Sequence, residues 1–318
     1  MRLWHIYHED IPMFLQEAAQ TPAMQRLKGV GMNCGCEYTS FPLFDSWQPY
    51  SRFDHSMGAA LITWHFTRDP HQAIAALLHD IATPVFSHVV DFLRGDHEKQ
   101  ESTESGTEEM ILGSPELRAV FEKYGIDPSL VTDYHMYPIA DNDSPRLSSD
   151  RLEYTLGNIV NFGYGTEETV KEYYNDLIAT EEELVFRTPK IGAAFAMDAL
   201  RCGRIYVSDI DRFSMQTLAD ILKKAVGEGI LAEADFYRQE QTVIEKLRSS
   251  RLAPLWEDYC ALCAIERRED GLVIPAKKRY IDPAATDGTR ASAYSPAFRA
   301  ELQGFLDWSF DYGLVAVA

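Results

Sequence analysis

Residues 53–66 carry apolar side chains on two faces of one predicted helix, and this feature constrains the fold more than any other. A helix that is apolar on both sides must be buried on both sides, so other helices have to cover it. His55 heads the second apolar face and therefore points into the protein. The first face consists of Phe53, Met57, Ala60, Leu61 and Trp64, and the second of Ala59, Ile62 and Phe66.

Two further segments place polar residues on helices that are expected to be buried. The apolar run 73–78 is followed at once by His79 and Asp80, and the predicted helix 147–160 carries Asp150. Buried polar groups need partners, because leaving them unsatisfied is costly. One interpretation is a helix-end ion pair beside a hydrogen-bonded core histidine. The other is convergence on one divalent cation, since imidazole suits Mn, Fe, Co, Ni or Zn and carboxylate suits Mn or Mg.

The rest of the pattern predicts a mainly α fold with small β-hairpins and a mixed α/β extension at the C-terminal end. Ser114 followed by Pro115 is typical of a helix start, and Gly125 of a helix end. The expected elements are a helix over 11–28, a short hairpin and loop over 29–49, a hairpin of strands 176–180 and 183–188, helices over 189–215, 217–229 and 255–268, and a strand over 272–280.

The charge of the chain limits its partners. Its 318 residues include 30 Lys and Arg against 49 Asp and Glu, a formal net charge of −19. Such a surface repels the phosphate backbone, so non-specific binding to nucleic acid is not expected. A small phosphorylated substrate is compatible with it, because a metal and a few arginines can reverse the field locally. The sequence does not decide whether the chain forms a homo-oligomer.

Hydropathy and cysteine content indicate a cytoplasmic protein. No apolar run approaches the 18 to 20 or so residues that a membrane span needs, and the first ten residues lack the apolar core of a secretory signal. The five cysteines are an odd, sparse set, which favours reduced thiols. A zinc site built from Cys34, Cys36, Cys260 and Cys263 is the less favoured alternative to small buried hydrophobic residues.

Five short motifs, taken in order, resemble the HD superfamily of metal-dependent phosphohydrolases, and most closely its deoxynucleoside triphosphate triphosphohydrolase branch. Gln25-Arg26-Leu27 upstream adds to the likeness, which covers about residues 15–230. The resemblance implies an HD-domain helical bundle over 1–235, followed by an extension of unknown role over 236–318. The motifs are 52–58 (Arg-Phe-Asp-His-Ser-Met-Gly), 77–81 (Leu-Leu-His-Asp-Ile), 86–88 (Phe-Ser-His), 96–98 (Asp-His-Glu) and 149–154 (Ser-Asp-Arg-Leu-Glu-Tyr).

The resemblance also implies roles for individual residues. The implied ligands of one divalent metal ion are His55, His79, Asp80 and Asp150. His88 and His97 are expected on the phosphate side of the site, with Glu98 orienting His97 as a proton donor. The phosphates are expected to be bound by Arg52, Arg151 and Arg212, with Tyr154 beside them, although Arg212 is equally well interpreted as a surface arginine.

One position departs from the family pattern. Thr83 stands where the triphosphohydrolases carry a second histidine after His79-Asp80, and threonine cannot shuttle a proton at neutral pH. We therefore expect a metal-dependent phosphohydrolase that acts on a nucleotide (dNTPs included) or a related phosphate ester through metal-activated water. The alternatives are an HD-type 5′-nucleotidase or phosphodiesterase, and a regulatory module that keeps the metal and binds nucleotides without turnover. The metal is Mn, Fe, Co, Ni, Mg or Zn.

Overall fold

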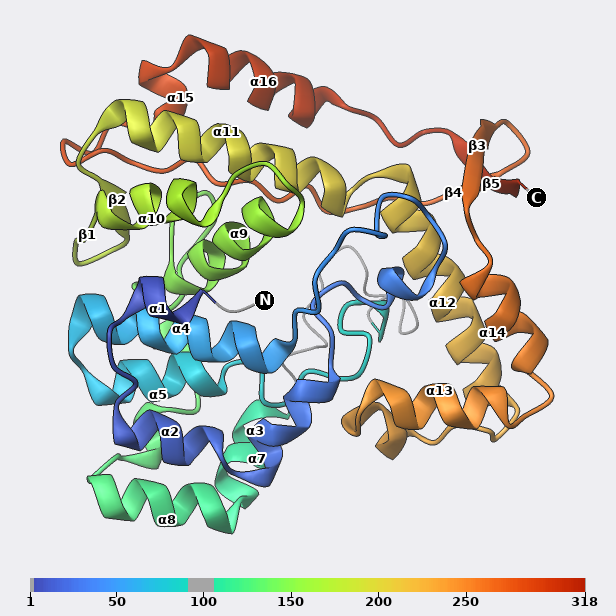
Figure 1. Cartoon of the computed structure of the whole chain (residues 1–318), viewed down its shortest axis with the longest axis horizontal. Helices are drawn as coiled ribbons and strands as arrows, with labels where there is room; N and C mark the ends of the chain where they lie inside the picture. The colour runs from blue at the N-terminus through green and yellow to red at the C-terminus, as the bar shows by residue number, and fades with distance from the viewer. Residues whose placement is uncertain (1–2, 91–105, 318) are drawn as a thin grey trace.

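The computed structural model of the chain describes residues 3–90 and 106–317 and is built mainly of α-helices, as predicted (Figure 1). The helices are α1 (Trp4–Tyr7), α2 (Met13–Ala19), α3 (Pro22–Arg26), α4 (Arg52–Thr67), α5 (Pro70–Leu78), α7 (Thr107–Gly113), α8 (Pro115–Tyr124), α9 (Ser149–Asn161), α10 (Glu167–Asn175), α11 (Pro189–Tyr206), α12 (Asp209–Gly227), α13 (Glu240–Arg248), α14 (Ala253–Cys260), α15 (Ala291–Tyr294) and α16 (Pro296–Asp307).

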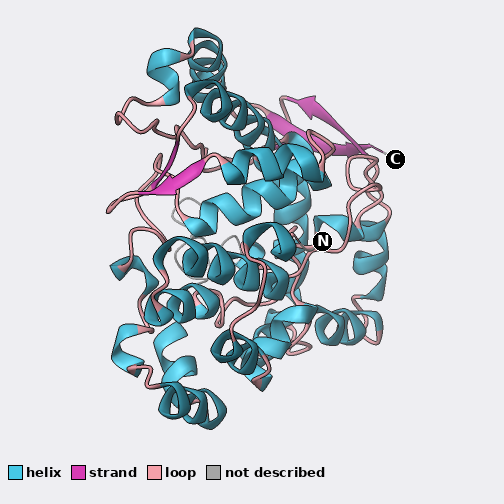
Figure 2. Cartoon of the chain, turned by 60° about the vertical axis from the view of Figure 1, so that its left-hand side comes forward, coloured by secondary structure: helices cyan, strands magenta, loops and turns pink. Residues whose placement is uncertain are grey.

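Two small antiparallel sheets accompany the helices (Figure 2). Strands β1 (Leu177–Ala179) and β2 (Leu184–Phe186) form the hairpin that the sequence predicts. In the second sheet, β5 (Gly313–Val317) lies between β3 (Ala264–Arg268) and β4 (Leu272–Val273). This sheet therefore joins the last strand of the described chain to a segment about 50 residues earlier.

Helix α4 is the centre of the fold, and every residue from Arg52 to Thr63 is buried. It begins where the Ser51 hydroxyl accepts a hydrogen bond from the Asp54 amide at 3.1 Å, and it packs against both α5 and α9. The prediction of a helix buried on both faces is confirmed. Because both α5 and α9 pack against α4, polar residues that these three helices turn toward one another can meet in the interior.

The other helices pack around this centre. In Figure 1, α2, α7 and α8 lie below α4 and α5, whereas α10, α11 and α16 lie above them. One hydrophobic cluster extends from Leu3 to Ile281 and includes Val243 and Trp256 of α13 and α14. A smaller cluster joins α11 to α15 and α16. The predicted division at residue 235 stays a prediction, although residues beyond it share the main core.

Several predicted elements are shorter than expected. The helix over 11–28 is divided into α2 and α3, and residues 29–49 contain a 3₁₀ turn, Cys36–Tyr38, and loops instead of a hairpin. The helix expected over 189–215 breaks after Tyr206, since the Ser208 hydroxyl caps α12 by accepting a hydrogen bond from the Asp211 amide at 3.2 Å. Only Leu272–Val273 of the strand over 272–280 is paired. The helix expected over 255–268 ends at Cys260, and β3 follows.

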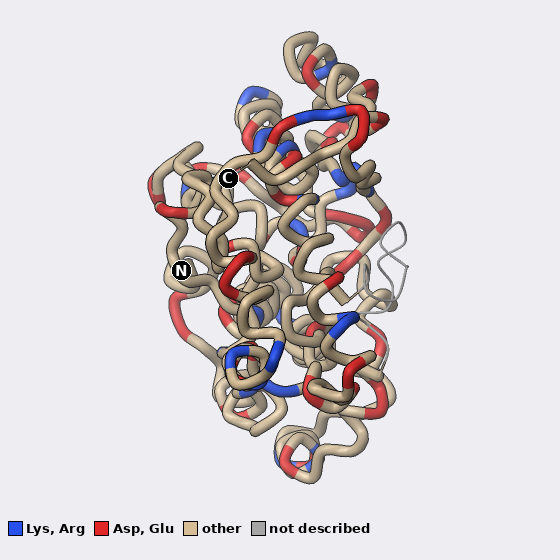
Figure 3. Tube along the Cα trace, turned by 90° about the vertical axis from the view of Figure 1, so that its right-hand side faces the viewer, with Lys and Arg blue, Asp and Glu red and all other residues tan. Residues whose placement is uncertain are grey.

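Acidic residues occur in many parts of the trace, with basic residues between them (Figure 3). Within the described ranges, no helix is both long enough and apolar enough to cross a bilayer.

Candidate metal centre and pocket

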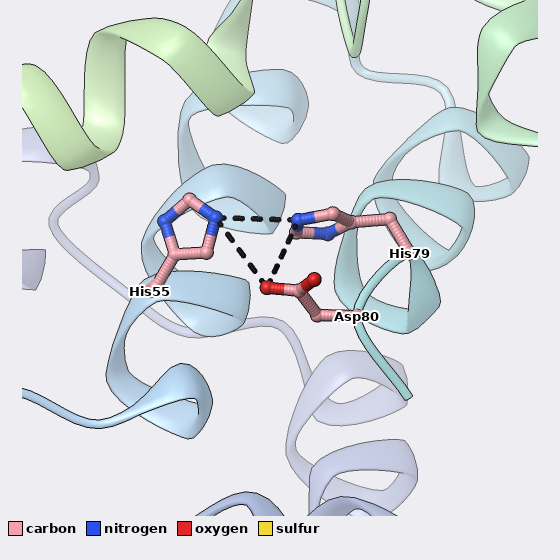
Figure 4. Close-up of side chains that lie close together, drawn as sticks. All are labelled: His55, His79 and Asp80. Atoms are coloured by element: carbon pink, nitrogen blue, oxygen red, sulfur yellow. Dashed lines mark hydrogen bonds and ion pairs between the residues drawn. The ribbon is translucent and has the colours of Figure 1, made fainter. Parts of the chain in front are cut away.

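The four predicted metal ligands converge at the inner ends of three helices. His55 comes from α4, His79 and Asp80 directly follow α5, and Asp150 lies in the first turn of α9. The Nε2 atoms of the two histidines are 3.2 Å apart (Figure 4). The Asp80 Oδ2 atom lies 3.8 Å from the Nε2 atom of His55 and 3.5 Å from the Nε2 atom of His79. The Asp150 Oδ1 atom lies 3.0 Å and 3.5 Å from the same two nitrogens.

This arrangement fits a divalent cation. Ligand bonds of about 2.0 to 2.2 Å would place neighbouring donor atoms about 3 to 3.5 Å apart, which is close to the separations between these side chains. The charges agree as well. When both imidazoles are neutral, the carboxylates of Asp80, Asp150 and Glu153 and the Arg52 guanidinium leave a net charge of −2 (−3 + 1). Mixed imidazole and carboxylate donors suit Mn, Fe, Co, Ni or Zn.

Hydrogen bonds to the outer ring nitrogens orient both imidazoles. The Nδ1–H group of His79 donates to the Ala76 carbonyl at 2.7 Å, and the Nδ1–H group of His55 donates to Glu153 Oε2, also at 2.7 Å. When the imidazoles are neutral, as metal binding requires, each Nε2 lone pair is therefore directed at the common point. Such partners fix the tautomer of a metal-binding histidine and raise its basicity.

Glu153 is a site residue that the sequence analysis did not assign. It is 2% exposed and accepts hydrogen bonds from the hydroxyls of Tyr7, at 3.5 Å, and Tyr50. Gly58 of α4 makes room for it, because a Cβ atom there would stand 2.5 Å from Glu153. The signal in the sequence is its position three residues after Asp150, on the same face of a helix.

The carboxylates and imidazoles stabilise one another's charged forms. Burial opposes a charged His55, yet hydrogen bonds to Asp150 and Glu153 raise its pKa to about 10. Burial likewise opposes ionisation of Asp80, but the neighbouring Arg52 and His79 hold its pKa below its ordinary value. The centre thus keeps Asp80 and Asp150 ionised, which is the state in which they bind a cation.

Thr83 and Arg52 both contact Asp80. The Thr83 hydroxyl donates to Asp80 Oδ1 at 2.7 Å, so it holds the oxygen that faces away from the histidines. The Arg52 Nη1 atom lies 2.9 Å from Oδ2, and its Nε–H group donates to the Ser87 hydroxyl at 3.1 Å. The residue that departs from the family pattern therefore orients a predicted metal ligand.

A pocket of about 260 Å³ opens over the centre. Among the predicted phosphate-side residues, Arg52, His88, Arg151 and Tyr154 line it. The Arg151 side chain is held by the Asp141 carboxylate at 3.3 Å and by the Arg146 carbonyl at 2.9 Å, and it also donates to Asn142. His97 and Glu98 lie outside the described residues.

Arg212 does not reach this pocket, so the expectation that it binds phosphate is corrected. It is not exposed at the surface either, because its side chain is 1% exposed and contacts the C-terminal part of the chain. Its Nη2 atom lies 2.7 Å from Asp209 Oδ1, its Nη1–H group donates to the Ile274 carbonyl, and its guanidinium carbon lies 4.4 Å from the centre of the Phe310 ring.

The pocket contains residues that the sequence analysis missed. Lys277 and Arg279 line it from the C-terminal extension. The run of three basic residues at 277–279 is unusual in so acidic a chain and could have marked them as candidates. Asp211 also lines it, and burial raises the pKa of its carboxyl to about 8. The aromatic part of the lining consists of Trp47, Tyr134, Tyr154, Phe162 and Tyr206.

Comparisons with known proteins found relatives over most of the chain. A Cordyceps militaris protein named metal-dependent phosphohydrolase cns2 is 28% identical over 296 residues, which cover 87% of this chain and 82% of the relative. The uncharacterised protein YdhJ of Bacillus subtilis is 24% identical over 241 residues, which cover 74% and 71%. The solved structure of a phosphohydrolase from Bacteroides thetaiotaomicron matches 96% of both chains with a TM-score of 0.65 and 17% identity. No model of a protein family matches the chain.

The likeness to the Bacteroides structure is one of fold, which it supports over nearly the whole chain. Of the two named relatives, cns2 is described as a metal-dependent phosphohydrolase, and none of the three names refers to the triphosphohydrolase branch.

Proposed function

We propose that this chain is a metal-dependent phosphohydrolase of the HD-domain superfamily, acting on a nucleotide or a related phosphate ester. One observation carries the proposal: the Nε2 atoms of His55 and His79 lie 3.2 Å apart and within 3.0 to 3.8 Å of one oxygen of each of two carboxylates, in a pocket that also carries cationic side chains. The similarity to cns2 supports a hydrolase enzyme.

The centre is suited to hydrolysis of a phosphate ester. A bound divalent cation would supply a coordinated water of lowered pKa and polarise a phosphoryl oxygen. His55, His79, Asp80 and Asp150 are the residues that would hold it. The Arg52 guanidinium faces the same point from the pocket wall and would offset charge on the phosphate, because guanidinium groups form strong hydrogen bonds with phosphate oxygens.

The remaining phosphate-side roles belong to the proposal as well. We assign proton donation to the leaving group to His97, with Glu98 holding its tautomer and His88 beside the phosphate. Arg151 and Tyr154 line the same wall and would position the phosphate.

The aromatic lining supports a nucleotide as the substrate. The Trp47 and Phe162 rings are stacked with their centres 4.5 Å apart, and Tyr206 lies next to Phe162 at 6.1 Å. Stacking of a base on aromatic side chains contributes about 1 to 3 kcal/mol and tolerates different bases. The wall that these rings form thus suits a base, while the metal centre suits the phosphate.

The presence of Thr83 makes a 5′-nucleotidase or phosphodiesterase activity a better fit to this site than dNTP triphosphohydrolase activity. Its hydroxyl already donates to Asp80, and it cannot transfer a proton at neutral pH as a histidine would. Retention of the metal without turnover is the remaining alternative, and product analysis separates all of these.

The test is an assay of purified protein with Mn²⁺ against nucleoside mono-, di- and triphosphates, cyclic nucleotides and dNTPs. We expect release of orthophosphate or a nucleotide that stops when a chelator is added. Asp80→Asn should abolish turnover and metal retention, whereas the same change at the exposed Asp143 should alter neither. Wild-type protein that retains Mn²⁺ and hydrolyses none of these compounds would contradict the proposal.

A further inference from the structure

Two of the cationic side chains that line the pocket come from a segment far from the metal ligands in sequence. Lys277 and Arg279 belong to residues 274–282, which we call the C-terminal strap. The strap leaves the sheet that contains β4 and continues as an extended coil past α11 towards α15 (orange in Figure 1). It brings positive charge to a pocket whose base is acidic.

The first end of the strap is fixed by Arg212. This buried guanidinium donates to the carbonyl of Ile274, which is itself 1% exposed. Its other contacts, with Asp209 and with the hydroxyl of Tyr312 at 3.4 Å, hold it in place. Arg212 therefore anchors the strap instead of contacting a ligand of the pocket.

The second end of the strap is fixed by the loop before α9. The Ser144 hydroxyl donates to the Tyr280 carbonyl at 3.2 Å, and the Asp282 amide donates to the Pro145 carbonyl at 3.0 Å. Because the strap is held at both ends by hydrogen bonds to other elements, the residues between them keep a defined position over the pocket.

Between these two ends, the strap backbone lies directly on α11. A Cβ atom at Gly203 would stand 3.0 Å from the Arg279 carbonyl oxygen, a distance shorter than ordinary van der Waals contact. Glycine at this position of the helix therefore permits the close approach. Arg279 also lies near Tyr154, which lines the pocket. Burial raises the pKa of Tyr154, and the positive charges of Arg151 and Arg279 act in the opposite direction.

Two of the three arginines assigned to phosphate from the sequence line the pocket and are already bound by protein groups. Arg52 contacts Asp80 and Ser87, and Arg151 contacts Asp141 and two backbone carbonyls. A phosphate entering the pocket would compete with these acceptors. Lys277 and Arg279 also line the pocket and are exposed to solvent, so their charges attract an incoming anion.

We infer that Lys277 and Arg279 bind the phosphate of the substrate, so that the C-terminal strap completes the active site. This inference rests on the proposed phosphohydrolase function, and it gives the C-terminal extension a role in specificity.

Isothermal titration of the full-length, Mn²⁺-loaded protein with inorganic phosphate tests the inference. Arg279→Gln and Lys277→Gln should each weaken phosphate binding roughly five-fold, and the double variant roughly 20-fold, a modest effect because both side chains are exposed. Lys278→Gln is the matched control. Its ammonium donates to the Leu306 carbonyl at 2.5 Å and does not line the pocket, so phosphate affinity should stay within two-fold of wild type.

The outcomes separate the two proposals. If wild-type protein hydrolyses a phosphate ester but the double variant binds phosphate like Lys278→Gln, the strap has no part in the site. The same conclusion follows if wild-type protein does not bind phosphate. If phosphate affinity falls as expected while no ester is hydrolysed, the strap binds anions and the proposed function is wrong. Circular dichroism and Mn²⁺ content confirm that each variant is folded with an intact centre.

Discussion

The two imidazoles of the centre are oriented by partners of different kinds. His79 donates to the carbonyl of Ala76, three residues earlier on its own helix. His55 instead donates to Glu153 on another helix, and that carboxylate is further held by Tyr50. A carboxylate partner increases the electron density on the ligating nitrogen, whereas a carbonyl mainly fixes the ring. The affinity of the centre for metal should therefore depend on Glu153 although it is not a ligand.

Glu153→Gln should lower metal affinity by roughly 10- to 100-fold, the usual effect of losing a hydrogen-bond partner of a metal-binding histidine. The amide keeps the shape of the side chain, so the far-ultraviolet circular dichroism spectrum should not change. The measurement is competition for Mn²⁺ with a metal-sensitive dye. Glu181→Gln, at an exposed position, serves as the control. An unchanged metal affinity would mean that Glu153 only packs against His55.

His97→Ala tests the proton donor that we assign in the proposed mechanism. It should lower kcat by roughly 10²- to 10⁴-fold on a nucleotide, the usual range for general acid catalysis, and leave Mn²⁺ content unchanged. The loss should be much smaller on an activated aryl phosphate, because that leaving group departs without a proton. Equal losses on both substrates would indicate that His97 positions the phosphate instead.

At the scale of elements, local signals predicted more than long-range ones. The Ser114 cap, Pro115 and the Gly125 stop place α8 correctly, because capping depends on neighbouring residues. The break between the helices over 189–215 and 217–229 was predicted too late in the chain, since only the Ser208 cap marks its actual place between Tyr206 and Asp209. From the sequence, His55 and Asp150 could be placed on inward helix faces, and His79 and Asp80 at the end of a buried helix. The C-terminal strap could not, because its position depends on contacts with residues up to about 140 positions away.

Gly203→Val is the element-scale test of the strap. The added Cβ would stand 3.0 Å from the Arg279 carbonyl oxygen, so the strap must move away from α11. Phosphate affinity should fall roughly as it does in Arg279→Gln, while metal affinity stays unchanged. Gly304→Val is the control, because α16 leaves open space around that glycine. Wild-type phosphate affinity in Gly203→Val would show that the strap tolerates displacement without effect on the pocket.

At the scale of the whole molecule, the centre is built from distant parts of one core. Helix α4 supplies His55, α9 supplies Asp150, and both belong to the hydrophobic cluster that extends to Ile281. The metal would therefore link elements that hydrophobic packing already holds together, and it would balance a net charge of −2 in the interior. Its removal should thus affect the stability of the entire fold instead of one loop.

Removal of the metal should lower the thermal midpoint, and the loss should grow as the pH rises. At a free metal concentration 100-fold above Kd, binding stabilises the folded state by about 2.7 kcal/mol, which corresponds to about 5 °C for a chain of this size.

The pH dependence follows from His55. In the metal-free protein, burial opposes its charge, but Asp150 and Glu153 raise its pKa to about 10, above the unfolded value of about 6.5. Protonated His55 therefore contributes stability fully below pH 6.5, and this contribution is lost as the pH rises towards 10. The metal requires neutral imidazoles, so the stability of the metal-loaded protein does not fall with rising pH in this way. Calorimetry of Mn²⁺-loaded and chelator-treated protein should show a gap between midpoints that widens from about pH 6 to about pH 8. A gap that stays constant or narrows would mean that His55 is already neutral in the metal-free protein.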